Sequence, residues 1–128
     1  MLLLLDTHAF LWWLGGDKHL SAEARAQVGD EANSVYVSAA SAWEVSTKIR
    51  LGKLPGAEFL ATDFVRHVLG QGFVGLDITL DHAQRAGNLP GPHRDPFDRM
   101  LIAQAQAESL ALVSNETDFD VYGVTRVW

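Results

Sequence analysis

The sequence contains no cysteine, which excludes disulfide bonds, thiolate metal ligands and catalysis by a thiol. It also contains no long apolar run. The run Leu2–Leu5 ends at Asp6 and is too short for a signal sequence or a membrane span. We therefore expect no association with membranes, and the absence of cysteine is compatible with a cytoplasmic location.

Positive charge is scarce, with 10 Lys and Arg residues against 16 Asp and Glu residues and a formal net charge of −6. This balance argues against nucleic-acid binding through bulk positive charge, although local basic side chains and bound cations would still permit an RNA substrate. The sequence has no glycine-rich phosphate loop, no dinucleotide-binding fingerprint and no Ser-His-Asp order. Its histidines lack the spacing of a metal-binding pair, so carboxylates are the favoured ligands.

Apolar segments alternate with helical patterns along the 128 residues, of which 48% are hydrophobic. We predict one domain covering residues 1–128, folded as a three-layer α/β/α sandwich around a central, mostly parallel sheet. The expected strands are residues 2–5, 35–37, 73–78, 110–113 and 124–127. The expected helices are residues 9–14, 21–29, 38–52, 57–69, 80–86 and 95–107.

Acidic residues recur where such a sheet binds ligands, beyond the carboxyl ends of its strands. Asp6 and the segment 114–118 follow apolar strands directly, and Glu44 and Asp98 lie near the starts of helices. Two carboxylates about 5 Å apart repel by roughly 3 kcal/mol at an effective dielectric near 20. Converging acids therefore predict a divalent cation, and their hard oxygen atoms favour Mg²⁺ or Mn²⁺.

Each acid also has a purely structural interpretation. Asp6 can cap the helix that follows it, and Glu44 can pair with Lys48 four residues later. Asp95 can cap the next helix, with Asp98 in its first turn. We expect both kinds of role at the last pair: Asp95 fixes the start of the helix, and this helix start directs Asp98 towards the strand ends.

Four segments together resemble PIN-domain proteins, most closely the VapC toxins of bacterial toxin–antitoxin pairs. They are LLLLDTHAFLWWL (2–14), SAASAWEVSTKIRLGKL (38–54), HRDPFDRMLIAQAQ (93–106) and LALVSNETDFDVYGV (110–124). The resemblance implies a PIN-like α/β/α fold and an endoribonuclease that depends on Mg²⁺ or Mn²⁺. It also implies an RNA substrate, an antitoxin that blocks the site, and a homodimer.

Matched by motif, the catalytic acids that the resemblance implies are Asp6, Glu44, Asp98 and Glu116. Asp6 and Asp98 would be the inner metal ligands. The family more often has Asp at the fourth position, so Asp118 and Asn115 remain alternatives to Glu116. Glu44 is a further possible metal ligand, and the supporting residues would be Asp95, Ser114 and Asn115. The candidate RNA contacts are Lys48, Arg94 and Arg99.

Two other functions remain open at this point. The first is an aspartate-based phosphatase or phosphotransfer domain, with Asp6 as the nucleophile. The second is a non-catalytic or regulatory PIN-like binding module whose acids only cap helices.

Overall fold

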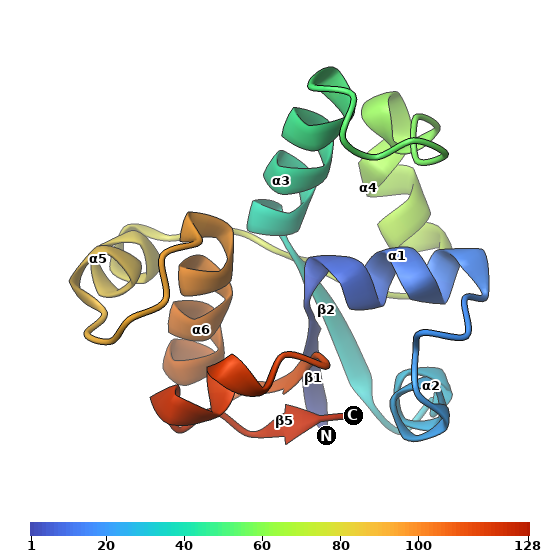
Figure 1. Cartoon of the computed structure of the whole chain (residues 1–128). Helices are drawn as coiled ribbons and strands as arrows, with labels where there is room; N and C mark the ends of the chain where they lie inside the picture. Colours follow the sequence, from blue (N-terminus) through green and yellow to red (C-terminus); the bar gives the residue numbers. More distant parts are fainter.

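The computed structural model describes all 128 residues. Five strands form one parallel sheet in the order β3-β2-β1-β4-β5 (Figure 1). The strands are β1 (Leu2–Leu5), β2 (Ser34–Ser38), β3 (Val74–Leu76), β4 (Ala111–Val113) and β5 (Arg126–Val127). The predicted sheet is confirmed, and all of its strand pairs are parallel.

The helices are α1 (Thr7–Gly15), α2 (Ala22–Gly29), α3 (Ala39–Arg50), α4 (Leu60–Gly70), α5 (Leu80–Asn88) and α6 (Pro96–Glu108), with a 3₁₀ helix η1 (Thr117–Tyr122). Figure 1 shows α1 and α2 on one side of the sheet, and α5 and α6 on the other. Helix α3 contacts α1 and α4 as well as α6, so it joins the two outer layers near the carboxyl edge. The predicted three-layer sandwich is confirmed.

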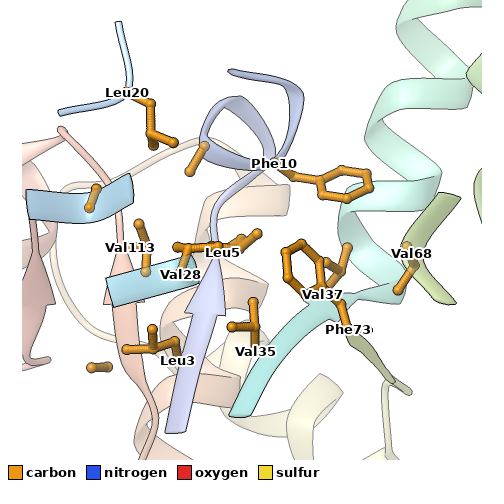
Figure 2. Packing of buried hydrophobic residues seen from close by; sticks show 13 residues of the cluster. Leu3, Leu5, Phe10, Leu20, Val28, Val35, Val37, Val68, Phe73 and Val113 are labelled. Carbon is orange, nitrogen blue, oxygen red and sulfur yellow. The ribbon is translucent and has the colours of Figure 1, made fainter. Parts of the chain in front are cut away.

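The run Leu2–Leu5 has no polar alternation because its strand is buried on both faces. Leu3 and Leu5 pack into one cluster with Phe10, Val28 and other residues of α1, α2 and α4 (Figure 2). Leu4 points to the opposite face and packs with Leu101 and other residues of α6. One strand therefore supplies both halves of the core.

Short polar side chains mark most of the helix starts, although α1 begins at Thr7 rather than at the predicted Ala9. The side chains that accept a backbone N–H at a helix start are Asp6, Ser21, Ser38, Thr79 and Asp95. Each satisfies a donor that would otherwise lack a partner in the first turn. No helix combines the length and apolarity needed to cross a membrane.

Several predicted boundaries were wrong. Helix α4 begins at Leu60 rather than at Ala57, and its backbone is kinked at Asp63. Strands β3 and β5 are shorter than expected. The segment after β4 is not only a loop, since it continues into η1. Phe119 of η1 is fully buried against residues of α6.

Candidate active site at the carboxyl edge of the sheet

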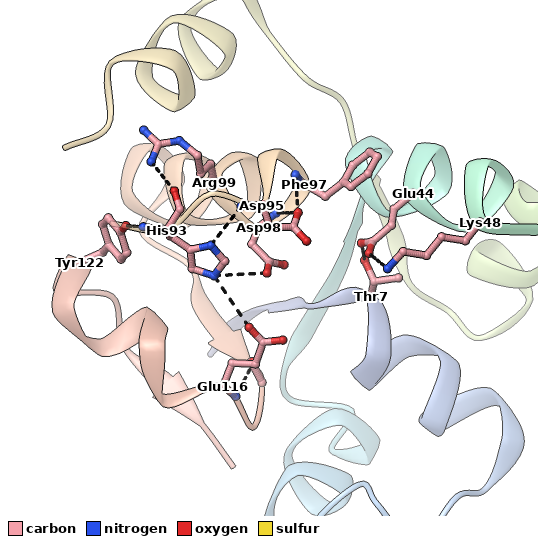
Figure 3. A network of polar contacts seen from close by, with 11 residues as sticks. Thr7, Glu44, Lys48, His93, Asp95, Phe97, Asp98, Arg99, Glu116 and Tyr122 are labelled. Atoms are coloured by element: carbon pink, nitrogen blue, oxygen red, sulfur yellow. Dashed lines mark hydrogen bonds and ion pairs between the residues drawn. The ribbon is translucent and has the colours of Figure 1, made fainter. Parts of the chain in front are cut away.

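The candidate site lies where β1 and β4 end side by side. Leu5 pairs with Val113, and the N–H of Asp6 donates to the Val113 carbonyl at 3.1 Å. This pairing places Asp6 next to Ser114, the residue after β4. Helices α3 and α6 complete the site with Glu44 and Asp98 (Figure 3).

Asp6 has two roles at once. One of its oxygens, Oδ1, accepts the Ala9 N–H at 2.8 Å and thereby caps α1. Only 4% of the residue is exposed. Burial raises the pKa of Asp6 to about 6, against hydrogen bonds from Ser114 and Ala9 that lower it. The capping role predicted from sequence is therefore present within a desolvated carboxyl group.

Asp98 is the electrostatic centre of the site. Burial is the largest cause that raises the pKa of Asp98 to about 8, followed by the negative charges of Asp95, Glu116, Glu44 and Asp6. All the other acids of the predicted set thus act on one carboxyl group. Such a group needs either a proton or a cation, because like charges in a poorly solvated site disfavour its ionised form.

Asp95 is the cap that positions Asp98, as predicted. Its Oδ1 accepts the N–H of Phe97 at 2.9 Å and that of Asp98 at 3.1 Å. Pro96 occupies the first turn of α6, where a missing N–H costs nothing. The cap and the site acid therefore occupy one turn with different tasks.

Glu44 is held at both of its carboxylate oxygens. Thr7 Oγ1 donates to Oε1 at 2.6 Å, and Lys48 Nζ donates to Oε2 at 2.5 Å. The helical ion pair with Lys48 is therefore present, while the charge of Glu44 also reaches Asp98. Burial alone would lower the pKa of Lys48, but the hydrogen bond and charge of Glu44 raise it overall.

Thr7 has no counterpart among the sequence-predicted site residues. Its hydroxyl group also lies 3.0 Å from Ser41 Oγ, so Thr7 joins the start of α1 to α3. The only sequence signal was its position directly after Asp6. A threonine at a helix start is too common for that position alone to assign it a role.

Glu116, rather than Asp118, faces the other acids. Its charge raises the pKa of both Asp6 and Asp98. Its N–H donates to Ser114 Oγ at 3.0 Å, which ties the loop to the end of β4. Asp118 and Asn115 are exposed, and together with Glu116 they line an open cleft beside His8 and Trp12.

His93 also belongs to the site, although the sequence singled out only acids there. Its Nε2 lies 3.3 Å from Asp98 Oδ2 and 3.9 Å from Glu116 Oε2 (Figure 3). Ligand atoms of the three residues all lie within 4.8 Å of one another. Sequence spacing missed His93 because its partners come from a different turn and a different loop.

The basic residues separate into two groups. Arg99 donates to the carbonyls of His93, at 2.8 Å, and of Ala86 and Leu89. These bonds tie Arg99 to α5 and to the loop before α6, and its role as an RNA contact stays a prediction. Arg94 is exposed, and Lys48 lies at the edge of the site beside Glu44.

The donor atoms fit Mg²⁺ or Mn²⁺. Carboxylate oxygens outnumber the one imidazole, and both ions prefer hard oxygen ligands. A cation would also offset the burial, and the smaller repulsion, that raise the pKa values of Asp6 and Asp98. The arrangement can hold a divalent cation and present it to an anionic ester.

Comparison with known proteins gives one consistent result. A family model for the PIN domain matches residues 3–124. A segment of 36 residues is 58% identical to ribonuclease VapC16 of Mycobacterium tuberculosis, and the match covers 28% of this chain and 26% of that protein. The match thus spans about a quarter of the relative's length.

Solved structures with the same fold cover nearly the whole chain. The VapBC2 structure from Rickettsia felis, bound to a promoter DNA fragment, aligns with a TM-score of 0.69 and 14% identity over 98% of this chain and 97% of that one. VapC20 of Mycobacterium tuberculosis, described as a toxin that cleaves the sarcin–ricin loop, aligns with a TM-score of 0.68 and 18% identity over 96% of each chain. At these identities the likeness shows the fold.

Proposed function

Because this chain belongs to the PIN-domain family, we propose that it is a metal-dependent endoribonuclease and the toxin of a toxin–antitoxin pair. One observation carries the proposal: the charges of Asp6, Glu44, Asp95 and Glu116 all act on Asp98. Helix capping needs a single acid at each helix start and gives no reason for such convergence. Similarity to a ribonuclease, VapC16, supports the choice of RNA as substrate.

Asp6 and Asp98 would hold the cation directly, with Glu116 as the fourth acid of the site. When bound, Mg²⁺ or Mn²⁺ would stabilise charge on the phosphate and lower the pKa of an attacking water. Glu44 is fixed by Thr7 and Lys48, so it can orient a water molecule without moving. Without a cation, Asp98 can hold a proton near neutral pH, because its pKa is raised to about 8. When a cation binds, Asp98 would lose this proton and act as a ligand.

The basic rim would guide the RNA backbone. Lys48 lies at the edge of the acidic site and Arg94 is exposed in the loop that carries His93. A protein with a net charge of −6 needs such local contacts, because its overall field repels RNA. We propose both residues as phosphate contacts.

An antitoxin partner and a homodimer are also part of this proposal. The solved neighbours include VapBC and FitAB structures, and one is described as a toxin–antitoxin complex from Klebsiella pneumoniae. The antitoxin would cover the acidic site and so suppress cleavage. Co-expression with the product of an adjacent small gene should yield a stable complex that lacks nuclease activity.

The test compares Asp98→Asn and Asp6→Asn with the wild type on purified RNA. Both substitutions keep the size of the side chain but remove its charge, so cleavage with Mn²⁺ should fall by roughly 10³-fold or more. Asp63→Asn, at an exposed position on α4, is the matched control and should cleave normally.

Two results would contradict this proposal, the first its site and the second its function. Retained cleavage by both site variants would disprove the site assignment and leave the acids as helix caps. A covalent phosphoryl group trapped on Asp6 would identify a phosphotransfer or phosphatase domain. Cleavage that EDTA abolishes and Mn²⁺ restores would support the nuclease.

A further inference from the structure

The loop before α6 is built around His93. Its backbone N–H donates to Tyr122 Oη at 2.9 Å, and its carbonyl accepts from Arg99 at 2.8 Å. The imidazole ring stacks on Phe119, with ring centroids 5.6 Å apart and an interplanar angle of 30°. The ring and the backbone of one residue are thus both fixed.

Tyr122 can hold this backbone only because residue 91 is glycine. Gly91 has a φ of +112°, and an added Cβ would lie 2.7 Å from the Tyr122 ring. Tyr122 therefore packs directly on the backbone of the loop. Since Tyr122 and Phe119 both belong to η1, which follows Glu116, the histidine loop and the Glu116 loop are joined.

The hydrogen bond at Nδ1 sets the tautomer of the ring. The N–H of Asp95 donates to His93 Nδ1 at 3.4 Å, so Nδ1 must act as an acceptor. In a neutral imidazole the other nitrogen then carries the hydrogen. That nitrogen, Nε2, points at the carboxylates of Asp98 and Glu116 (Figure 3).

We propose that His93 is a positioning residue whose Nε2–H faces Asp98 Oδ2 at 3.3 Å, with Glu116 Oε2 further away at 3.9 Å, and that it is not a metal ligand. The inference rests on the proposed nuclease site. With Nδ1 accepting a hydrogen bond and Nε2 protonated, the ring has no free lone pair for a cation. The Nε2–H lies close to Asp98 Oδ2 and is directed towards Glu116 Oε2, so the other oxygen of each carboxylate is left for the ion.

This role accounts for the contacts that fix the backbone and the ring of His93. Partners that orient metal-binding carboxylates change metal affinity or activity by about 10- to 100-fold when they are removed. A donor placed between two acids also offsets their repulsion without adding a competing ligand. The two acids come from α6 and from the loop after β4, and His93 fixes the distance between them.

The experiment measures Mn²⁺ affinity by calorimetry for the wild type, His93→Leu and His93→Gln, with RNA cleavage measured in parallel. Leucine fills much of the ring's volume but has no donor, so affinity should fall about tenfold. Glutamine can place an amide N–H near the position of Nε2, so affinity and cleavage should return to within about threefold of the wild type. His19→Leu, an exposed histidine that contacts Asp17, is the control and should behave as wild type.

Pulsed electron paramagnetic resonance of the Mn²⁺-loaded wild type separates a donor from a ligand. The proposal requires no coupling from a directly coordinated imidazole nitrogen. Observation of that coupling would overturn it, as would a His93→Leu variant with wild-type affinity and a wild-type melting temperature.

Failure of this inference can be distinguished from failure of the proposed function. A wild type that binds Mn²⁺ and cleaves RNA, together with an unaffected His93→Leu variant, would remove only the role of His93. A wild type that binds no Mn²⁺ would overturn the nuclease site and the role of His93 with it. If His93→Leu has a clearly lower melting temperature than the wild type, Tyr122→Phe is measured in its place. This variant loses the hydrogen bond to the His93 backbone but keeps the imidazole ring, so its Mn²⁺ affinity should fall by a smaller factor.

Discussion

Two groups of polar residues are buried in this protein, one under α5 and one at the carboxyl edge of the sheet, and both contain a histidine. His82 accepts the Thr79 N–H at Nδ1 and directs Nε2 to Glu108 at 2.8 Å. His93 accepts the Asp95 N–H at Nδ1 and directs Nε2 to Asp98 and Glu116. The local geometry is the same, so the surroundings of each ring decide what it does.

Around His82, each donor meets an acceptor. Gln104 is fully buried and accepts from Ser38 Oγ at 2.6 Å, while its amide group faces the Asp77 carbonyl and His82. Charges of one sign do not accumulate there. A network with all its partners present stabilises a fold and needs no further ligand.

At the carboxyl edge, by contrast, charges of one sign accumulate. The pKa values of Asp6 and Asp98 are raised to about 6 and about 8, which means that ionising them costs free energy in the folded chain. This unfavourable charge distribution has no structural benefit unless a cation joins it. The difference between the two regions therefore favours a structural role for the first and supports the proposed metal site in the second.

The largest effect expected is on stability, from His82→Leu. The substitution would leave Glu108, Gln104 and the Thr79 N–H without their partner, at a cost of about 3 kcal/mol in the free energy of unfolding. Urea denaturation measures this cost. Mn²⁺ affinity should stay within about twofold of the wild type. A large loss of affinity in a folded variant would show that the residues around His82 also contribute to metal binding.

Stabilisation of the protein by Mn²⁺ should depend on the acids of the carboxyl edge and not on the residues around His82. Mn²⁺ at 100 times its dissociation constant should add about 2.7 kcal/mol to the unfolding free energy of the wild type. Asp98→Asn should lose most of this response, whereas Glu108→Gln should keep it. Thermal melts at several Mn²⁺ concentrations measure the effect, and equal responses in the two variants would contradict the site.

The pH dependence of the metal-free protein follows from Asp98. Its folded pKa of about 8 exceeds the ordinary value of 3.8, so the folded state binds the proton more tightly. Stability should therefore fall as pH rises from about 4 to about 8 and then level off. Asp98→Asn should remove most of this loss, leaving the smaller contribution of Asp6, and should be more stable than the wild type by about 2 kcal/mol at pH 9, once solvent screening is allowed for.

The wild type and Asp98→Asn should have nearly equal stability near pH 2.5, about one unit below the ordinary value of 3.8, where the carboxyl group of Asp98 is largely protonated in the folded and the unfolded state. Denaturation curves at the two pH values supply the comparison. An advantage for Asp98→Asn that persists unchanged in acid would point to packing rather than charge.

The smallest expected effect is on Mn²⁺ affinity, and it distinguishes Glu116 from Asp118. Glu116→Gln should weaken Mn²⁺ binding about tenfold, since its charge reaches Asp6 and Asp98. Asp118→Asn, at an exposed position on η1, should change it by less than about twofold. Calorimetry on both variants decides the fourth acid, and the reverse order of effects would assign Asp118.

Much of the fold could be predicted because its signals are local. The uninterrupted run Leu2–Leu5 predicts a strand buried on both faces, and Asp95-Pro96 predicts the start of α6. These patterns depend on neighbours in the chain. The boundaries that were wrong, such as the start of α4 and the turn of η1, depend on distant packing, as the burial of Phe119 shows.

By itself, the sequence determined the parallel sandwich, the capping role of Asp95 and the set of acids that gather at the carboxyl edge. Only the tertiary structure decided how those acids are held. Thr7 and Lys48 fix Glu44, Arg99 binds carbonyls of its own chain, and His93 reaches Asp98 and Glu116. The physical reason is the separation of the interacting residues along the chain. Caps and buried strands depend on adjacent residues, whereas these contacts require segments far apart in the chain to come within about 4 Å of each other.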